Sequence, residues 1–276
     1  MSNLVGMVDE TRAVLRMSGN DTRDVLQAVI TNDVEQVTSE RAVYAALLTP
    51  QGKFLFDFFL LADGSDILID CAANRTEDLI KRLKMYCLRR QALVTHDEGL
   101  RVSLAWPGEG SSHHPPPPPS PGQAAISVPD PRNAGLGWRL YGKDLPELTP
   151  ADQTSYDALR VALAVPEGGR ELLADETYIL EAGFERLNGV DFRKGCYVGQ
   201  EVTARMKHKT ELRKGIVVVG VEGNAPEGTE ITGDGKPAGK LFTQAGGRAL
   251  AHLRFDRAKG ALTAGDAILR YPVDAD

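Results

Sequence analysis

One segment of the chain combines a cysteine with residues that would make its thiol accessible and reactive. Residues 194–201 read KGCYVGQE, so Cys196 lies between Gly195 and Gly199 and close behind Lys194. Glycines at this spacing allow a tight turn that exposes the residues between them. A neighbouring cation favours the thiolate, the form that reacts or binds metal. The alternative is a turn that holds a buried and inert cysteine.

A basic stretch surrounds this segment. Between Asp191 and Lys214, seven Lys or Arg residues stand against three acids, an excess of four positive charges in a chain whose net charge is −6. Such a stretch attracts anions, and polyglutamyl folate tails, phosphates and RNA all qualify. A solvated basic face is the alternative. Specific RNA recognition is not expected, because Phe192 and Tyr197 are the only aromatic residues here that could stack on bases.

Two further polar positions could contact a ligand. Asp57 lies among aromatic residues in the sequence FLFDFF, where burial would raise its pKa and let it hold a ligand amine or act as a base near neutral pH. It could equally lie on the open face of a half-exposed strand. Gln27 and the polar run Thr31–Asp33 end the first expected helix, where they either contact a ligand or satisfy the helix terminus.

The motif KGCYVGQE, preceded by NGVDF at residues 188–192, resembles the signature of the YgfZ-type folate-binding proteins. These proteins are related to the T-protein (aminomethyltransferase) of the glycine cleavage system, and their mitochondrial counterparts assist the maturation of 4Fe–4S proteins. The resemblance extends from about residue 10 to about residue 270 and is weakest in the middle. It implies tetrahydrofolate, or a folate derivative, as cofactor.

The resemblance also implies individual folate contacts. Asp57 takes the position of an aspartate that lies next to the folate nitrogens in T-proteins. Arg160 matches an arginine of a T-protein helix, but Ala162 stands where that helix carries a pterin-binding glutamate. A missing hydrogen-bond partner would cost roughly 1–3 kcal/mol, which puts T-protein-type substrate binding in doubt. Glu181 is a candidate pterin contact, although Gly183 replaces an asparagine that family members often show.

The predicted site therefore has two groups of residues. The candidate catalytic residues are Cys196, Lys194 and Asp57. The candidate folate-binding residues are Asp57, Arg160, Glu181, Gln27, Tyr197, Gln200 and Arg205. No metal site is expected, because three cysteines without a CxxC pair cannot supply the four thiolates that usually hold an iron–sulfur cluster. Any cluster role would be assisted, shared or transient.

We predict a tetrahydrofolate-binding protein that assists the assembly or repair of 4Fe–4S proteins through Cys196. The alternative is a tetrahydrofolate-dependent aminomethyltransferase or another one-carbon transferase, and whether any reaction is catalysed stays open. A third interpretation is an RNA- or protein-binding module that uses the basic stretch 193–214. The expected partners are iron–sulfur client proteins or assembly factors, with no specific nucleic acid and no membrane. We expect a monomer.

The apolar pattern indicates an α+β fold. It predicts helices over 77–90 and 154–165 and one that begins near Asp21, and the expected strands are 10–18, 42–48, 53–61, 66–71, 92–95 and 100–105. After residue 214, short strands separated by glycine-rich turns indicate a small C-terminal β-barrel or sandwich.

The resemblance implies a T-protein-like ring of three domains around a central channel. The N-terminal α/β folate-binding domain would comprise residues 1–41 and 152–212, interrupted by a ferredoxin-like domain over 42–151, with the barrel over 213–276. Asp57, Arg160 and Glu181 would face the channel, and Cys196 would lie near its mouth.

Composition places few further limits on this chain of 276 residues. Residues 107–121 hold seven of its sixteen prolines and predict an exposed loop, in which His113 and His114 alone would make a weak metal site. The cysteine count fits a reducing compartment. Because the N-terminal sequence resembles neither a secretory signal nor an Arg- and Ser-rich transit peptide, we expect a cytoplasmic location.

Overall fold

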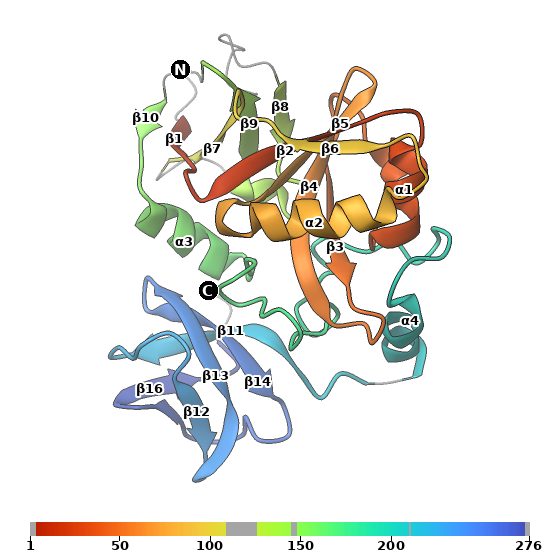
Figure 1. Ribbon diagram of the computed structural model, residues 1–276. Coiled ribbons are helices and arrows are strands. Elements are labelled where there is room, and N and C mark those ends of the chain that lie inside the picture. The colour runs from red at the N-terminus through yellow and green to blue at the C-terminus, as the bar shows by residue number, and fades with distance from the viewer. Residues whose placement is uncertain (1–3, 109–125, 145–147, 210, 274–276) are drawn as a thin grey trace.

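The computed structural model describes residues 4–108, 126–144, 148–209 and 211–273. Figure 1 shows two β-sheets with their helices in the upper part of the molecule and a barrel below them. The predicted α+β class and C-terminal barrel are confirmed. The expected proline-rich loop, with His113 and His114, lies outside the described residues from residue 109 onward.

The first sheet contains five strands in the order β3-β4-β5-β2-β6. All neighbouring pairs are antiparallel. The strands are β2 (Arg12–Ser18), β3 (Val43–Leu48), β4 (Phe54–Asp63), β5 (Asp66–Ala72) and β6 (Leu93–His96).

Strand β4, an interior strand of this sheet, is buried on both faces. Phe56, Phe58 and Leu60 belong to the core under the helices, whereas Phe59 and Leu61 belong to the core that faces the second sheet. This alternation follows from the two-residue period of a strand. It explains why the sequence here is a continuous apolar run rather than an alternating one.

Two helices cover one face of this sheet. Helix α1 (Thr22–Val29) buries Leu26, and α2 (Thr76–Tyr86) buries Leu79 and Leu83, in the same apolar cluster as β4. Helix α2 ends at Tyr86, four residues before the predicted end. Arg89 has a φ of 64°, which a right-handed helix cannot accommodate. Short 3₁₀ turns occur at Val34–Gln36, Ala73–Arg75 and Ala134–Leu136.

The second sheet has the strand order β10-β1-β7-β9-β8. The sequence pattern predicted only β7 among these strands. The strands are β1 (Leu4–Val8), β7 (Arg101–Pro107), β8 (Ile126–Pro129), β9 (Trp138–Gly142) and β10 (Thr149–Pro150).

The hydrogen bonds of the two sheets do not follow the predicted boundary between residues 41 and 42. Strands β1 and β2 precede that boundary, yet β1 pairs with β7, and β2 pairs with β5 and β6. Each sheet is therefore built from both sides of it.

Six strands form the closed barrel, in the order β11-β14-β13-β12-β15-β16. Its small interior is filled largely by Ala, Val, Ile and Leu side chains. The strands are β11 (Lys214–Glu222), β12 (Glu230–Gly233), β13 (Lys236–Ala245), β14 (Arg248–Arg254), β15 (Leu262–Ala264) and β16 (Ala267–Arg270).

Two helices complete the fold. Helix α3 (Gln153–Ala162) packs against β13 and β14 of the barrel, and the Asp152 carboxylate caps it by accepting the Ser155 N–H at 2.9 Å. Helix α4 (Gln200–Lys209) was not predicted, because Val202 and Met206 are too few apolar residues to give a helical period. No helix in the described part of the chain has the length and apolar character that crossing a bilayer requires.

Candidate functional site

A layer of buried charge lies between the two sheets. Asp57 and Phe59 on β4, Asp70 on β5 and Arg12 on β2 share the face that is directed at the second sheet. From the second sheet, Arg139 on β9 reaches across, and its Nη2 lies 2.7 Å from Oδ2 of Asp70. On the other side of the carboxylate, Arg12 Nε donates to Oδ1 of Asp70, also at 2.7 Å.

Asp70 is ionised in this layer. Burial by itself would raise the pKa of Asp70, but attraction to Arg12 and Arg139 outweighs burial and lowers the pKa below its ordinary value. The Tyr141 hydroxyl donates a further hydrogen bond to Asp70 at 2.8 Å. These partners satisfy a carboxylate that has no exposed surface.

Phe59 lies beneath three guanidinium groups. Their central carbons are 3.9 Å (Arg139), 4.9 Å (Arg132) and 5.4 Å (Arg12) from the ring centre, within the range of cation–π attraction. Arg132 is in turn held by both oxygens of Asp130, at 3.0 and 2.8 Å. The positive charges of the layer therefore lie between carboxylates and an aromatic face.

Asp57 has fewer partners than Asp70. Only 5% of its surface is exposed, and its Oδ2 accepts one hydrogen bond, from the Tyr44 hydroxyl at 3.1 Å. Burial raises the pKa of Asp57, and attraction to Arg12 and Arg132 offsets only part of this effect. The carboxyl therefore holds a proton to higher pH than an exposed aspartate does, as its aromatic surroundings suggested.

The space beside Asp57 does not fit a pterin. The cavity that Asp57 lines has a volume of about 20 Å³, room for roughly one water molecule and far too little for a two-ring pterin. Gly168 closes this space so tightly that a Cβ atom there would lie 2.1 Å from Oδ1 of Asp57. We therefore derive no chemical step through folate at this position.

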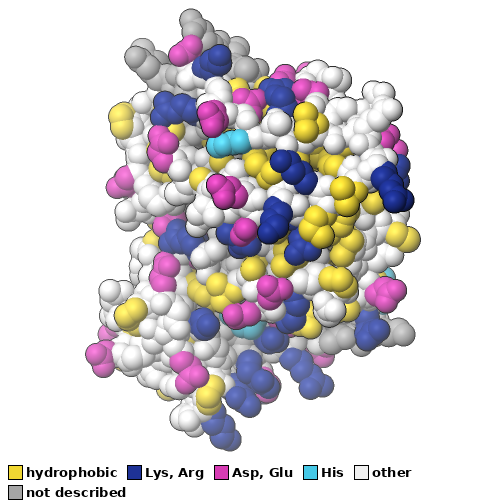
Figure 2. All heavy atoms as spheres, in the orientation of Figure 1, with side chains coloured by type: hydrophobic (Ala, Val, Ile, Leu, Met, Phe, Trp, Pro, Cys, Tyr) yellow, Lys and Arg dark blue, Asp and Glu magenta, His cyan; other side chains and the backbone are white. Residues whose placement is uncertain are grey.

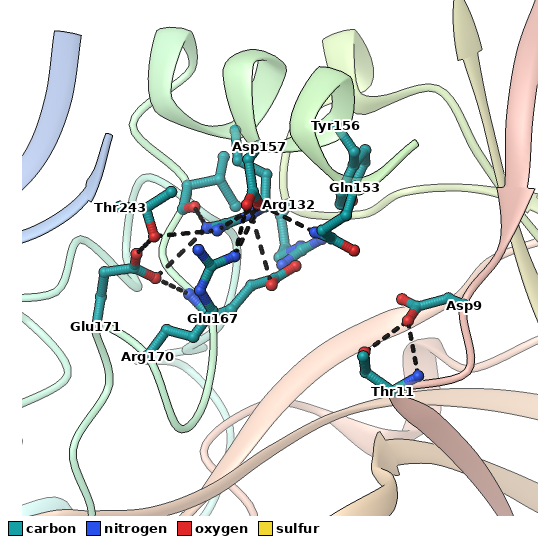
Figure 3. A network of polar contacts seen from close by, with 12 residues as sticks. Asp9, Thr11, Arg132, Gln153, Tyr156, Asp157, Glu167, Arg170, Glu171 and Thr243 are labelled. Atoms are coloured by element: carbon teal, nitrogen blue, oxygen red, sulfur yellow. Dashed lines mark hydrogen bonds and ion pairs between the residues drawn. The ribbon is translucent and has the colours of Figure 1, made fainter. Parts of the chain in front are cut away.

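Arg160 belongs to an ion cluster and not to a ligand channel, which corrects the role that the resemblance implied for it. It is fully buried, and its nitrogens lie 2.9 Å from Asp157, 3.4 Å from Glu171 and 3.5 Å from Glu167. Glu171 also accepts a hydrogen bond from Thr243 of β13. Figure 3 shows these carboxylates converging between α3 and the barrel. The donors of Arg160 are thus occupied in joining the barrel to the rest of the fold.

Glu181 lies where the barrel meets the upper part of the molecule. It is 9% exposed, and its Oε2 is 3.3 Å from Lys214 Nζ and 3.5 Å from His252 Nε2. Its backbone oxygen accepts the N–H of Ile216 at 2.7 Å. These contacts hold β11 in place and do not bring Glu181 together with Asp57.

Gln27 connects α1 to the 3₁₀ turn that follows it. Its side-chain amide donates to Asp33 at 2.8 Å and accepts the backbone N–H of Val34 at 2.9 Å. These polar residues therefore satisfy local groups, but the N–H that Gln27 satisfies belongs to the 3₁₀ turn and not to the end of α1.

The segment that leads to Cys196 is hydrogen-bonded to the loop after α1. Thr31 Oγ1 donates to the carbonyl of Gly189 at 2.7 Å, and Asn32 Nδ2 donates to the carbonyl of Asn188 at 2.6 Å. Both donors are buried. This part of the signature is therefore held by side-chain to backbone hydrogen bonds that span about 155 residues of sequence.

Lys194 also binds the chain around the end of α1. This contact corrects its predicted role as the cation that activates the thiol. Its ammonium donates to the carbonyls of Gln27, Ile30 and Asn32, at 2.7, 2.6 and 3.0 Å. All three of its N–H donors thus point toward the end of α1. Burial lowers the pKa of Lys194 to about 8, and Asp33 opposes this shift.

Gly199 fixes the other end of the cysteine loop. Its φ is 84°, and a Cβ atom there would lie 2.5 Å from the backbone oxygen of Thr49, in the turn between β3 and β4. Only glycine allows both this backbone conformation and this approach. Gly195 differs, because a Cβ atom there would meet nothing within 4 Å.

Cys196 lies between these two anchors and is exposed. The other two cysteines are less accessible: Cys71 on β5 is buried, which raises its pKa to about 11, and Cys87 after α2 is half-buried, with a pKa that burial also raises. By its exposure, Cys196 is the thiol that a partner can reach. The predicted alternative of a buried, inert cysteine does not apply to it.

The remaining predicted residues surround this loop. Tyr197 is half-buried, and its backbone N–H donates to Gln200 Oε1 at 3.2 Å, which closes the start of α4. Arg205 on α4 is exposed. These residues are therefore near Cys196 in the chain but are not brought together with Asp57, Arg160 or Glu181 by any described contact.

A cavity of about 520 Å³ opens beside the signature segment. Asn188, Asp191 and Arg193 line it from the signature, and Tyr44 and Arg41 line it from β3 and the residues before that strand. Tyr44, which is among the residues that line this cavity, also donates its hydroxyl hydrogen to Asp57. Among the described residues, no group of three or more His, Cys, Asp or Glu side chains is arranged to hold a metal ion.

The fold defines the class of protein. A crystal structure of the glycine cleavage system aminomethyltransferase T from Bartonella henselae superposes with a TM-score of 0.76, covering 97% of this chain and 84% of that one. The sequence identity is 13%, so this likeness concerns the fold alone. The T-protein-like architecture expected from the resemblance is confirmed.

Sequence comparison narrows the class to a family. The chain is 33% identical to the human mitochondrial iron–sulfur cluster assembly factor IBA57, over 91% of this chain and 78% of the human protein. The Neurospora crassa homologue is 31% identical, over 79% of this chain and 54% of that protein. Residues 213–275 match the family described as CAF17, C-terminal beta-barrel domain. The chain belongs to the IBA57 family of iron–sulfur cluster assembly factors.

These relatives correct the predicted location of the protein and do not test its assignment to the YgfZ-type proteins. The human, mouse and Neurospora proteins are all named mitochondrial, which overturns the cytoplasmic location inferred from the N-terminal residues. The narrower assignment to the YgfZ-type folate-binding proteins stays a prediction, since the matches identify the related IBA57 branch.

Sequence reasoning missed the arginines of the buried layer. Arg12 and Arg139 looked like ordinary charged residues, because they share Asp70, which comes from a different strand. Arg132 pairs with Asp130 two residues before it, and nothing in that short sequence indicated that the pair is buried. A signal was present in β9, where Arg139 lies in the otherwise apolar sequence WRLYG. An arginine within such a strand is retained only when a buried partner satisfies it.

Within the buried layer, we expect Asp70→Asn to lower the free energy of unfolding by about 3–5 kcal/mol, because Arg12 and Arg139 would lose their counter-charge. The matched variant Asp57→Asn should be neutral or stabilising at pH 7, since it replaces a carboxyl that is costly to ionise. Urea unfolding of both variants measures the difference. Equal losses would contradict this assignment of charges.

Asp70 and Asp57 should also affect the pH dependence of stability in opposite directions. The pKa of Asp70 is lowered on folding, so its stabilisation is lost as the pH falls below the ordinary value of 3.8. The pKa of Asp57 is raised from 3.8, so the wild type should lose stability relative to Asp57→Asn as the pH rises through the raised value. A constant difference between wild type and Asp57→Asn from pH 4 to pH 8 would exclude this shift.

Gly199→Ala should loosen the cysteine loop, whereas Gly195→Ala should not. The first change forces a strained left-handed conformation and a clash with backbone, at a cost of about 1–3 kcal/mol, while the second adds a methyl group in open space. Hydrogen exchange of residues 194–202 provides the measurement. Equal protection in both variants would show that Gly199 does not anchor the loop.

Proposed function

We propose that this protein assists the assembly or repair of 4Fe–4S proteins by presenting the Cys196 thiolate as a single ligand. The observation that carries this proposal is the exposure of Cys196 on a loop anchored at both ends, by Lys194 and by Gly199. A pre-ordered loop binds a ligand without first losing conformational freedom, which favours a ligand that must engage and release.

One thiolate cannot hold a cluster alone, because such clusters usually need four protein ligands. Cys71 and Cys87 lie on other elements, and one is buried and the other half-buried. The remaining ligands must therefore come from a client or assembly protein. Membership of the IBA57 family supports this role, since its named members are iron–sulfur cluster assembly factors.

The surroundings of Cys196 suit an anionic cargo. Arg193 lies three residues before it, and Arg205 lies exposed on the helix that follows, where Lys207 is paired with Glu185. Clusters bound by thiolates carry net negative charge, so these cations favour their approach.

Aminomethyl transfer is less well supported. Ala162 lacks the glutamate that the resemblance places there, Arg160 is bound within the protein, and the cavity beside Asp57 is small. Tetrahydrofolate binding stays a prediction drawn from the resemblance. The proposed role of Cys196 does not require tetrahydrofolate.

The test is rescue of cells that lack the gene. Cys196→Ser should reduce the restored activity of a 4Fe–4S dehydratase by at least about tenfold, because a ligand to the cluster is lost. Cys87→Ser is the matched control and should rescue as well as the wild type. Glycine cleavage is assayed in the same cells and should not depend on the gene.

Full rescue by Cys196→Ser would contradict the proposal. Loss of glycine cleavage without loss of the dehydratase would instead assign the protein to aminomethyl transfer.

A further inference from the structure

A second surface, distant in sequence from Cys196, has the features of a docking site. Three large apolar side chains are more than half exposed in the described part of the chain: Met85 at 58%, Leu88 at 74% and Leu93 at 58%. They fall within nine residues, from the end of α2 to the start of β6. Single exposed apolar residues are normal, but a local group of them marks an interaction site.

The same region is strongly basic. Residues 81–90 contain five cations and no acid, in a chain whose net charge is −6. Lys81, Lys84, Arg89 and Arg90 are exposed, and none has a carboxylate partner among the described residues. Figure 2 shows hydrophobic side chains gathered over the region where Figure 1 draws α2, with Lys and Arg side chains beside them.

The turn that carries Leu88 and Arg89 is held in place. Arg90 N–H donates to the carbonyl of Cys87 at 3.0 Å, and Arg89 adopts a positive φ. Gln91 is then tied to Asp21, whose carboxylate accepts the Gln91 N–H at 2.7 Å. The exposed side chains therefore project from an ordered turn.

The adjacent strand offers backbone hydrogen bonds. β6 is the edge of the first sheet and, within the described residues, pairs with β2 alone. An edge strand presents unpaired N–H and C=O groups to another extended chain. A lipid surface could match the cations and the apolar side chains, but it could not satisfy these backbone groups.

We propose that this α2–β6 surface, formed by Lys81, Lys84, Met85, Leu88, Arg89, Arg90 and strand β6, docks an acidic partner protein. An extended segment of that partner adds as a strand beside β6. Its apolar side chains cover Leu88 and Leu93, and its carboxylates meet the unpaired cations. This inference does not rest on the role of Cys196.

The test uses a fluorescein-labelled peptide of alternating Glu and Val, about eight residues long, which is within the usual length range of strands and longer than β6. It should bind the full chain, weaken with added salt, and slow amide hydrogen exchange at Leu93–His96. Arg89→Glu combined with Arg90→Glu should reduce the affinity by at least about tenfold. The control pair, Lys236→Glu with Lys259→Glu on the barrel, should leave the affinity unchanged.

A peptide of alternating Lys and Val, and vesicles that contain phosphatidylserine, complete the experiment. Absence of binding by the acidic peptide, equal binding by the basic one, or binding that survives the arginine changes would each overturn the proposal. Binding to the vesicles alone would overturn it in favour of a membrane surface.

Discussion

The two sheets of this protein are joined through a layer of buried charge. The position of the cysteine loop depends on this layer. Asp70 is shared by arginines from both sheets, so their stacking is specified by directional ion pairs as well as by apolar contact. Buried ions are costly to desolvate and tolerate little displacement. The layer therefore restricts how the sheets can sit on one another more than an apolar interface would.

The signature segment is connected to this layer through Tyr44. The hydroxyl of Tyr44 binds Asp57, and its backbone oxygen accepts from Asn32, which also holds Asn188 at the start of the signature. From there the chain runs to Lys194, to the exposed Cys196 and to the close contact at Gly199. The result is an accessible thiol on a loop that is anchored on both sides, by Lys194 and by Gly199. The T-protein-like fold here supports a surface loop, whereas the interior beside Asp57 is filled.

Local sequence predicted strands β3 and β4, helix α1 and the barrel, because each follows from apolar period and turn residues over a short range. It also identified the accessible cysteine through its glycines, of which Gly199 is conformationally required and Gly195 is not. The roles of Lys194 and Arg160 could not be predicted. Lys194 depends on carbonyls more than 160 residues away, at the end of α1. The carboxylates around Arg160 are close in sequence, but two of them, Glu167 and Glu171, lie in the irregular segment after α3, where no apolar period indicates how the chain folds back. Helix α4 was missed because it has little apolar period and is fixed at its start by the close packing of Gly199.

The central claim is that this chain contributes one thiolate to a cluster and holds none by itself. Native mass spectrometry after anaerobic reconstitution with iron and sulfide tests it most directly, first with a phosphine reductant and then with an added monothiol. The account predicts no cluster on the chain in phosphine, and a cluster that requires Cys196 once the monothiol supplies the remaining ligands. A cluster bound without added thiol, or one retained by Cys196→Ser, would contradict it.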